Sequence, residues 1–447
     1  MWPTPDAGGP DAVEAGWPPS HATPSSWTLV GAGGWGEDAS MERTACCIVG
    51  GGPAGMMLGV LLARAGVPVT VLEKHHDFLR DFRGDTVHAS TLALLDELGL
   101  GDRFRALPHR TLERLEFPLP AGGLVPIDLR LLPGPYRHIA MVPQWDLLDL
   151  LADAGRREPA FELRMGTAVT GLMRENGRVV GVRYRDAGGE GELRATVTVG
   201  CDGRSSAVRA ASGLPVREFG VPLDVWWFRV PRRPQDPEGL FGRPGDGAAV
   251  IAIDRGDYFQ VGFQIRKGAD AAMRAQGLES FRRRVAAIAP EFADRLDAVR
   301  SWDDVKLLTV RLNRMPRWYR PGLLCIGDAA HAMSPVGGVG INLAVADAVA
   351  AARVLEPALR RGRVRSVDLA RVQARRWVPT FVTQLLQRLA HRFFVQPRLT
   401  GAPEPRVPLP VRGLFRRYRG PRAVLARLFA IGVLPEHAPP FARRAPT

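Results

Sequence analysis

The order of hydrophobic and polar positions predicts short buried strands alternating with helices. Unbroken apolar runs are typical of strands buried on both faces of a parallel sheet, and they occur at 46–49, 67–72, 195–201 and 323–326. Apolar residues three and four apart predict helices at 56–65, 91–98, 144–151, 278–288 and 341–355. Further strands are expected at 111–117, 124–129, 225–230, 249–253, 258–265 and 305–311, with a meander over 161–185. The pattern therefore indicates an α/β fold that also contains antiparallel strands.

The first apolar run leads into a glycine turn that opens a helix. Gly50, Gly52 and Gly55 fill the three glycine positions of G-x-G-x-x-G, which serve the tight turn, the approach of a pyrophosphate and close helix–strand packing. The helix N-terminus adds unpaired N–H groups and a partial positive charge. The next strand ends on Glu73, where a carboxylate can bind ribose hydroxyls. This pattern predicts a site for a dinucleotide.

Two more acids close apolar strands further along the chain. Asp202 follows the strand at 195–201, and Gly327-Asp328 follow the strand at 323–326. A single Asp-Gly pair is most often an ordinary turn. Ligand contacts in a doubly wound sheet, however, gather at the carboxyl ends of the strands. We therefore expect one extended dinucleotide to reach all three strand ends.

The three motifs, in this order, resemble those of the class A FAD-dependent monooxygenases, the para-hydroxybenzoate hydroxylase type of aromatic hydroxylase. Residues 201–209 look like the Asp-Gly fingerprint of that family, and residues 327–335 look like its Gly-Asp fingerprint. The resemblance covers about 44–355. It implies a Rossmann-like FAD-binding domain of three-layer ββα type, with an inserted β-sheet substrate domain and C-terminal helices.

The resemblance and the pattern together divide the chain into segments. A leader rich in Pro, Gly, Ala and Ser is expected to be disordered, and Met41 behind it is a candidate start. The expected segments are a leader at 1–40, an FAD-binding domain at 41–112, 139–218 and 306–355, a substrate domain at 113–138 and 219–305, and a C-terminal helical region at 356–447.

The family also implies roles for individual residues in holding FAD. Glu73, beside Lys74, would hold the adenosine ribose, Asp328 would bind ribityl hydroxyls, and Asp202 would support the Gly-Asp segment and the approach of the nicotinamide donor. Arg83 and Gln144 would lie near the pyrophosphate and the ribityl chain, and Gly340, Ile341 and Asn342 would meet the flavin pyrimidine edge. The N-terminus of the helix at 341–355 would supply positive potential there.

The chemistry implied by the resemblance needs NADPH or NADH, O₂ and a small apolar or aromatic substrate. A flavin C4a-hydroperoxide would hydroxylate or epoxidise an aromatic or polyketide-like molecule in a pocket that excludes water. Pro335 is expected on the loop where substrate meets flavin, while His331 is more often structural in this motif. The aromatic candidates for its wall are Trp226, Trp227, Phe228, Phe241, Tyr258, Phe259 and Phe263. Strand alternation turns only half of them inward, and the predicted pocket residues are Trp226, Phe228, Tyr258 and Phe263. The sequence selects no catalytic acid or base.

Two other functions stay open on the sequence alone. A reductase of the geranylgeranyl-reductase type would use the same FAD scaffold on a prenylated or apolar substrate without O₂. A flavin-binding protein that sequesters an intermediate would show no turnover. Oxygen uptake that depends on substrate and NAD(P)H separates these alternatives from a monooxygenase.

Charge and cysteine content limit the other partners. The formal net charge is +14, and the segment from Arg353 onward holds twenty arginines and four acids. No aromatic-interleaved basic face supports nucleic-acid binding, whereas peripheral membrane contact through this segment stays open. Four cysteines without metal-ligand spacing predict no metal site and a reducing, cytoplasmic location, and no apolar run is long enough to span a membrane. Monomer and homodimer are not distinguished.

Overall fold

The largest sheet of the computed structural model is mainly parallel. The structure describes residues 42–79, 86–118, 124–245, 247–402 and 418–445, so the predicted leader lies outside the described residues. The strand order is β19-β20-β11-β1-β2-β8, with β10 and β9 continuing antiparallel from β11. Its strands are β1 Glu42–Val49, β2 Val69–Leu72, β8 Phe161–Arg164, β9 Ala168–Glu175, β10 Arg178–Asp186, β11 Gly189–Gly200, β19 Tyr319–Arg320 and β20 Leu323–Cys325.

The register of this sheet aligns the predicted strand ends. Val49 pairs with Leu72 on one side and with Gly200 on the other, and Gly200 pairs with Cys325. All four strands are parallel, so the residues that follow them leave the sheet at one edge. At about 4.8 Å between neighbouring strands, this edge spans roughly 14 Å from β2 to β20.

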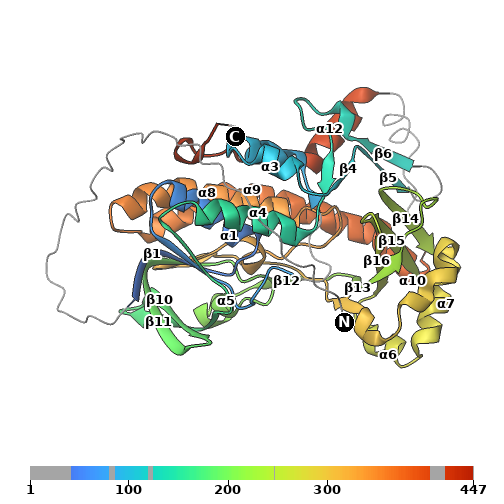
Figure 1. Ribbon diagram of the computed structural model, residues 1–447, viewed down its shortest axis with the longest axis horizontal. Coiled ribbons are helices and arrows are strands. Elements are labelled where there is room, and N and C mark those ends of the chain that lie inside the picture. Colours follow the sequence, from blue (N-terminus) through green and yellow to red (C-terminus); the bar gives the residue numbers. More distant parts are fainter. Residues whose placement is uncertain (1–41, 80–85, 119–123, 246, 403–417, 446–447) are drawn as a thin grey trace, which may run out of the picture. The chain divides into compact units, whose positions relative to one another are not determined.

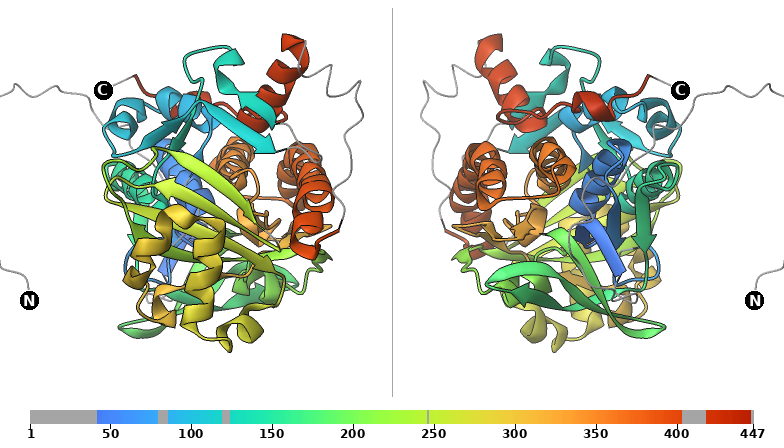
Figure 2. Two further views of the ribbon diagram at one scale, coloured as in Figure 1. Left: turned by 90° about the vertical axis from the view of Figure 1, so that its right-hand side faces the viewer. Right: turned by 90° about the vertical axis from the view of Figure 1, so that its left-hand side faces the viewer.

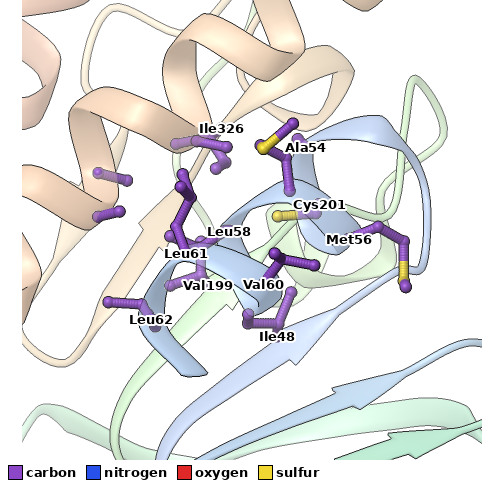
Figure 3. Close-up of a cluster of buried hydrophobic side chains, with 14 of the residues drawn as sticks. Ile48, Ala54, Met56, Leu58, Val60, Leu61, Leu62, Val199, Cys201 and Ile326 are labelled. Atoms are coloured by element: carbon purple, nitrogen blue, oxygen red, sulfur yellow. The ribbon is translucent and has the colours of Figure 1, made fainter. Parts of the chain in front are cut away.

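Helices cover this sheet and bury its apolar side chains. The helices α1 Pro53–Arg64, α4 Gln144–Arg156 and α8 Gly340–Arg360 pack together, α1 lying against both others (Figure 1). Residues 54–63 of α1 are all buried, as expected for a helix enclosed between a sheet and a second helix. Figure 3 shows Leu58 and Leu61 of α1 among Ile48, Val199 and Ile326. Each such side chain contributes about 1.5–3 kcal/mol.

A five-stranded antiparallel sheet follows in the chain, with the order β14-β15-β16-β13-β17. Its strands are β13 Leu223–Pro231, β14 Leu240–Gly245, β15 Ala248–Asp254, β16 Tyr258–Arg266 and β17 Lys306–Leu308. The short α6 Asp270–Arg274 and α7 Leu278–Ile288, with η2 Pro290–Ala298, lie against it (Figure 2). The strand expected at 305–311 is shorter in the structure, because β17 ends at Leu308. The next strand, β18 Leu312–Arg314, begins beyond the expected range and pairs with β12 Arg217–Phe219 in another sheet.

Smaller elements complete the described chain. They are β3 Thr86–Val87, β4 Arg110–Leu112, β5 Arg114–Pro118, β6 Leu124–Asp128 and β7 Ile139–Met141, with α2 Ala89–Glu97, α3 Gly101–Arg105, α5 Ala207–Ser212, α9 Ser366–Ala390, η5 His391–Val395, α10 Gln396–Thr400 and α12 Arg419–Ala430. The C-terminal α12 returns to pack beside β6, about 290 residues earlier in sequence (Figure 2). None of the described helices is long and apolar enough to cross a bilayer.

Candidate active site

The glycine turn forms an open cradle at the edge of the parallel sheet. Gly50 has a φ of +105°, and a Cβ there would lie 2.6 Å from the Cys201 carbonyl oxygen, so only glycine fits. A Cβ at Gly52 would meet no described atom within 4 Å. Gly52 is also the N-cap of α1, and no side chain caps that helix. The first turn of α1 thus lacks a capping side chain among the described residues and starts beside open space, as expected of a helix N-terminus that binds a phosphate group.

Glu73 is buried beside this turn and already held by hydrogen bonds. Its Oε2 accepts from the Gly51 amide at 2.8 Å, and its Oε1 accepts from the His75 amide at 3.1 Å and contacts the His75 ring. Burial raises the pKa of Glu73, but these hydrogen bonds outweigh burial and hold the pKa below its ordinary value. The side chain is thus an ionised acceptor in a fixed position.

The carboxylate of Asp202 is engaged in hydrogen bonds within the protein. Its carboxylate accepts from Ser206 Oγ at 2.5 Å and from the Val208 amide at 3.0 Å, which caps α5. Burial is the main reason that the pKa of Asp202 is raised. The neighbouring Gly-Asp turn is held instead by Arg209, whose guanidinium donates to the Ala329 carbonyl at 2.8 Å. The expected support of this turn therefore comes from Arg209, a residue that the sequence did not single out.

Asp328 begins the turn after β20 and faces the edge with a partly exposed carboxylate. Its Oδ2 lies 3.4 Å from Arg204 Nε, and its side chain is 29% exposed. Glu73 and Asp328 thus follow parallel strands of one sheet and leave it at the same edge. The sequence-based expectation that the two acids lie on one side of the molecule agrees with this register.

A buried ionic network fixes the Gly-Asp turn from behind. Asp347 of α8 is fully buried, accepts from the Gly327 amide at 3.0 Å and lies 2.5 Å from His331 Nε2. Its other oxygen accepts from Arg376 Nε of α9 at 2.9 Å. Burial raises the pKa of Asp347, but His331 and Arg376 together bring it below its ordinary value. His331 therefore has a structural place in this network, as expected.

A large cavity opens between the Gly-rich loop and the antiparallel sheet. Its volume is about 2170 Å³. The loop before α8 contributes Pro335 and Gly338, the sheet contributes Val225 and Trp227, and α12 contributes Phe429. Most other lining side chains are aliphatic. Charged side chains such as Arg243 and Arg422 also line it, but the walls are mostly apolar and suit a large apolar molecule.

A family model described as an FAD binding domain matches residues 43–384. The chain belongs to this family. The 6-methylpretetramide 4-monooxygenase of Streptomyces rimosus is 36% identical over 396 residues, covering 87% of this chain and 93% of that protein. The protein is accordingly an FAD-dependent monooxygenase, which confirms the predicted family, cofactor and enzyme class.

Solved structures agree on the fold of this monooxygenase. The OxyS anhydrotetracycline hydroxylase from Streptomyces rimosus gives a TM-score of 0.70 at 26% identity, covering 88% of this chain and 76% of that chain. PqsL, a probable FAD-dependent monooxygenase from Pseudomonas aeruginosa, gives 0.67 at 23% identity, covering 81% and 99%. The predicted α/β fold class, with its C-terminal helices, is confirmed.

The first turn of α8 borders the cavity of the monooxygenase, because Val339, Asn342 and Leu343 line it. No side chain of the described residues caps this helix, and a Cβ at Gly340 would meet no described atom within 4 Å. The side chain of Asn342 is hydrogen-bonded within the protein: its Oδ1 accepts from the His88 backbone amide at 2.9 Å and from Thr91 Oγ1 at 2.7 Å. Only backbone groups of Gly340, Ile341 and Asn342 are thus available to a flavin edge.

Strand alternation corrects the aromatic pocket candidates. Trp226, Phe228 and Phe263 do not line the cavity; they are at most 1% exposed and form a core with α7. Tyr258 is half-buried at the start of β16, with Arg229 stacked 4.8 Å from its ring centre, and is also absent from the cavity wall. The neighbouring Trp227 faces the cavity instead, because successive residues of a strand face opposite sides.

The remaining predicted cofactor residues lie in different elements. A Cβ at Gly55 would lie 2.0 Å from the Gly50 carbonyl oxygen, Lys74 is exposed after Glu73, and Gln144 starts α4 half-buried. Arg83 lies outside the described residues. Within the described ranges no group of His, Cys, Asp or Glu side chains is arranged to hold a metal ion.

His88 is a cavity residue that the sequence did not single out. It is 2% exposed, its Nδ1 lies 3.0 Å from the Phe429 carbonyl of α12, and its ring lies against the Phe429 ring. Burial is the main cause that lowers the pKa of His88 to about 4, so the imidazole is neutral at physiological pH. A single histidine in a polar loop carries no signal of this contact, which depends on a helix 341 residues later.

Proposed function

We propose that this monooxygenase oxygenates a fused-ring, polyketide-like aromatic molecule. The observation that carries the proposal is the mostly apolar cavity of about 2170 Å³ beside the loop that precedes α8. Ligand pockets for drug-sized molecules are usually about 300–1,000 Å³. The cavity has room for a flavin ring beside Gly337 and Gly338 and for a substrate of several rings. The names of the relatives in the tetracycline series support the same substrate class.

We further propose how the edge residues hold FAD. Glu73 would accept from the adenosine ribose, the N-terminus of α1 behind Gly52 would bind the pyrophosphate, and Asp328 would accept from the ribityl hydroxyls. The N–H groups at the start of α8 would stabilise negative charge on the pyrimidine edge of the flavin. The open spaces at Gly52 and Gly340 and the fixed, ionised Glu73 support this assignment.

The chain's own part in the reaction is to bind, orient and exclude water. FAD, when bound, supplies the redox chemistry, taking electrons from NADPH or NADH and activating O₂. Pro335 and Trp227 would place the substrate ring against the loop side of the cavity. The aliphatic walls keep water from the reacting atoms, which protects reactive species from hydrolysis. Neutral His88 adds no charge to this environment.

Substrate-dependent oxygen uptake tests the reaction. The purified protein should be yellow, and multi-ring phenolic polyketides should stimulate both NAD(P)H oxidation and O₂ consumption, with one oxygen atom from ¹⁸O₂ appearing in the product. Single-ring phenols serve as matched compounds and should stimulate less, because they leave most of the cavity unfilled. NAD(P)H-dependent reduction of an apolar substrate without O₂ uptake would instead favour a reductase of the geranylgeranyl-reductase type.

Flavin content tests the proposed cofactor contacts. Asp328→Ala should purify with much less FAD, because hydrogen bonds to a charged acceptor contribute roughly 1.5–3 kcal/mol. Asp186→Ala is the control: this acid is in a hairpin at the far end of β10, away from the edge. Full flavin occupancy in Asp328→Ala would contradict the assignment of Asp328.

A further inference from the structure

Three arginines converge on one aromatic ring outside the cavity. The guanidinium carbons of Arg217, Arg314 and Arg388 lie 5.6, 5.7 and 5.0 Å from the centre of the Phe219 ring. Arg314 also stacks on Trp377 at 4.4 Å and on Phe381 at 5.2 Å. Within the part of the chain that the structure describes, none of the three arginines has a carboxylate within ion-pair distance.

This arrangement works against folding. Arg217 and Arg314 are direct partners across the β12–β18 pair, and like charges in that position are destabilising. Burial, and then the charges of Arg217 and Arg388, lower the pKa of Arg314. Glu218 lies between Arg217 and Phe219, yet its carboxylate accepts from Asn313 at 2.9 Å on the other face of the strand. The cluster is therefore uncompensated positive charge that an anion would stabilise.

The cluster is attached to the Gly-Asp loop. The residues on both sides of Arg314 hydrogen-bond to that loop: the Asn313 amide donates to Ala332 at 3.2 Å and the Met315 amide to Ala330 at 2.8 Å. Phe219 belongs to the same apolar cluster as Val339, which lines the cavity and is the N-cap of α8. A ligand on the arginines would thus contact a ring whose apolar cluster also includes the residue that precedes α8.

We propose that Arg217, Arg314 and Arg388 bind the phosphate-bearing adenosine end of NADPH. Guanidinium forks match phosphate oxygens in geometry and charge, and exposed aromatic rings stack on nucleobases. Phe381 is 44% exposed and Trp377 is half-buried, so both ring edges are accessible beside the arginines. The proposal rests on the proposed function, in which a nicotinamide nucleotide reduces the flavin, and it predicts a preference for NADPH over NADH.

Donor binding can be measured without knowing the substrate. In the FAD-loaded enzyme, Arg217→Gln and Arg388→Gln should each raise the apparent Kd for NADPH roughly tenfold, read from the rate of anaerobic flavin bleaching against NADPH concentration. The Kd for NADH should change by less than about threefold, because NADH lacks the 2′-phosphate. Arg283→Gln on the exposed face of α7 removes the same charge and should change neither value.

Two further readouts separate binding from a structural role. Titration with NADP⁺, followed by tryptophan fluorescence, should show the same weakening in both cluster variants. Arg217→Gln should at the same time raise Tm by about 1–2 °C, because it removes a like-charge pair. A residue needed only for folding would lower Tm instead.

The possible outcomes separate a failure of the proposed NADPH site from a failure of the proposed monooxygenase function. Unchanged NADPH and NADP⁺ affinities in both variants would overturn the site while leaving the monooxygenase assignment intact. Binding of the wild type to vesicles of anionic phospholipid, lost in the variants while donor affinity is unchanged, would overturn it in favour of a membrane contact. If neither nucleotide reduces the wild-type flavin, the proposed function fails, and the NADP⁺ titration still tests the cluster.

Discussion

The edge of the parallel sheet and the cavity beside the antiparallel sheet meet at the loop before α8. They differ in chemistry: the edge is polar and hydrogen-bonded, and the cavity wall is mostly apolar. At the edge, Glu73, Asp202 and Asp347 are all held by protein hydrogen bonds. The cavity walls are mostly aliphatic and aromatic side chains from segments as distant as β13 and α12. A buried polar group that is misplaced loses the whole free energy of its hydrogen bond. The free energy of an apolar contact falls only gradually as the fit between the side chains worsens.

Because of this difference, we expect the two regions to tolerate amino-acid substitutions to different extents. The edge must present the same groups to the same cofactor, so its geometry is over-determined by the buried network behind it. The cavity can change shape with little cost as long as its volume stays filled and dry. Substitutions at the edge should therefore change stability and flavin binding, and substitutions in the wall should change which substrate is taken.

The largest effect is expected from Asp347→Asn. Removing this charge leaves Arg376, which is 2% exposed, with Glu436 at 3.8 Å as its one remaining carboxylate partner among the described residues, and breaking a buried ion pair costs about 3–5 kcal/mol. The free energy of unfolding, measured with urea, should fall by that amount. Asp102→Asn, which breaks an exposed pair with Arg105, should cost less than about 1 kcal/mol. Equal losses in both variants would show that the network does not determine the edge.

The next effect is expected from Gly52→Val, which fills the phosphate cradle without touching the protein. The backbone of Gly52 has a φ of −75°, which valine can adopt, and no described atom lies within 4 Å of its Cβ position. FAD affinity should fall on the order of a hundredfold, through the loss of about two phosphate hydrogen bonds, while the apoprotein keeps its Tm. Gly55→Val, whose Cβ would lie 2.0 Å from a carbonyl oxygen, should instead fail to fold.

The same contrast explains what the sequence could predict. The edge is built from short contiguous motifs, so Gly50, Glu73 and Asp328 were found by spacing, and the sheet register brings them to one edge. The network around Asp347 joins three segments and has no local signal. The residues of the cavity wall are harder still to predict from sequence, because an error of one residue in the position of a strand exchanges its two faces. Trp226 was chosen where Trp227 lines the cavity.

His88 links the two regions and gives a pH test. Its pKa is about 4 in the folded protein and about 6.5 when unfolded, so the unfolded chain binds the extra proton between these values. Stability from this group is complete above pH 6.5 and is lost as the pH falls toward 4. Between pH 7 and pH 5 the loss should be about 2 kcal/mol.

Urea unfolding at the two pH values measures that loss, and His88→Gln should remove it from the difference. His437, whose ring is mostly exposed beside Glu97, provides the matched substitution. If the pH dependence of the free energy of unfolding is unchanged in His88→Gln, the contact between α12 and the residue at position 88 does not depend on a neutral imidazole.

The sharpest contrast comes from two adjacent tryptophans of β13 that face opposite sides of the sheet. Trp227→Leu enlarges the cavity and should raise KM for a multi-ring substrate by about tenfold or more, with flavin content unchanged, because a filled apolar contact is worth about 1–3 kcal/mol. Trp226→Leu on the opposite face leaves a hole in the core and should cost about 3 kcal/mol in stability while changing KM less. If both substitutions change KM equally, the two faces of β13 are not functionally separate, and the wall cannot vary independently of the core that supports it.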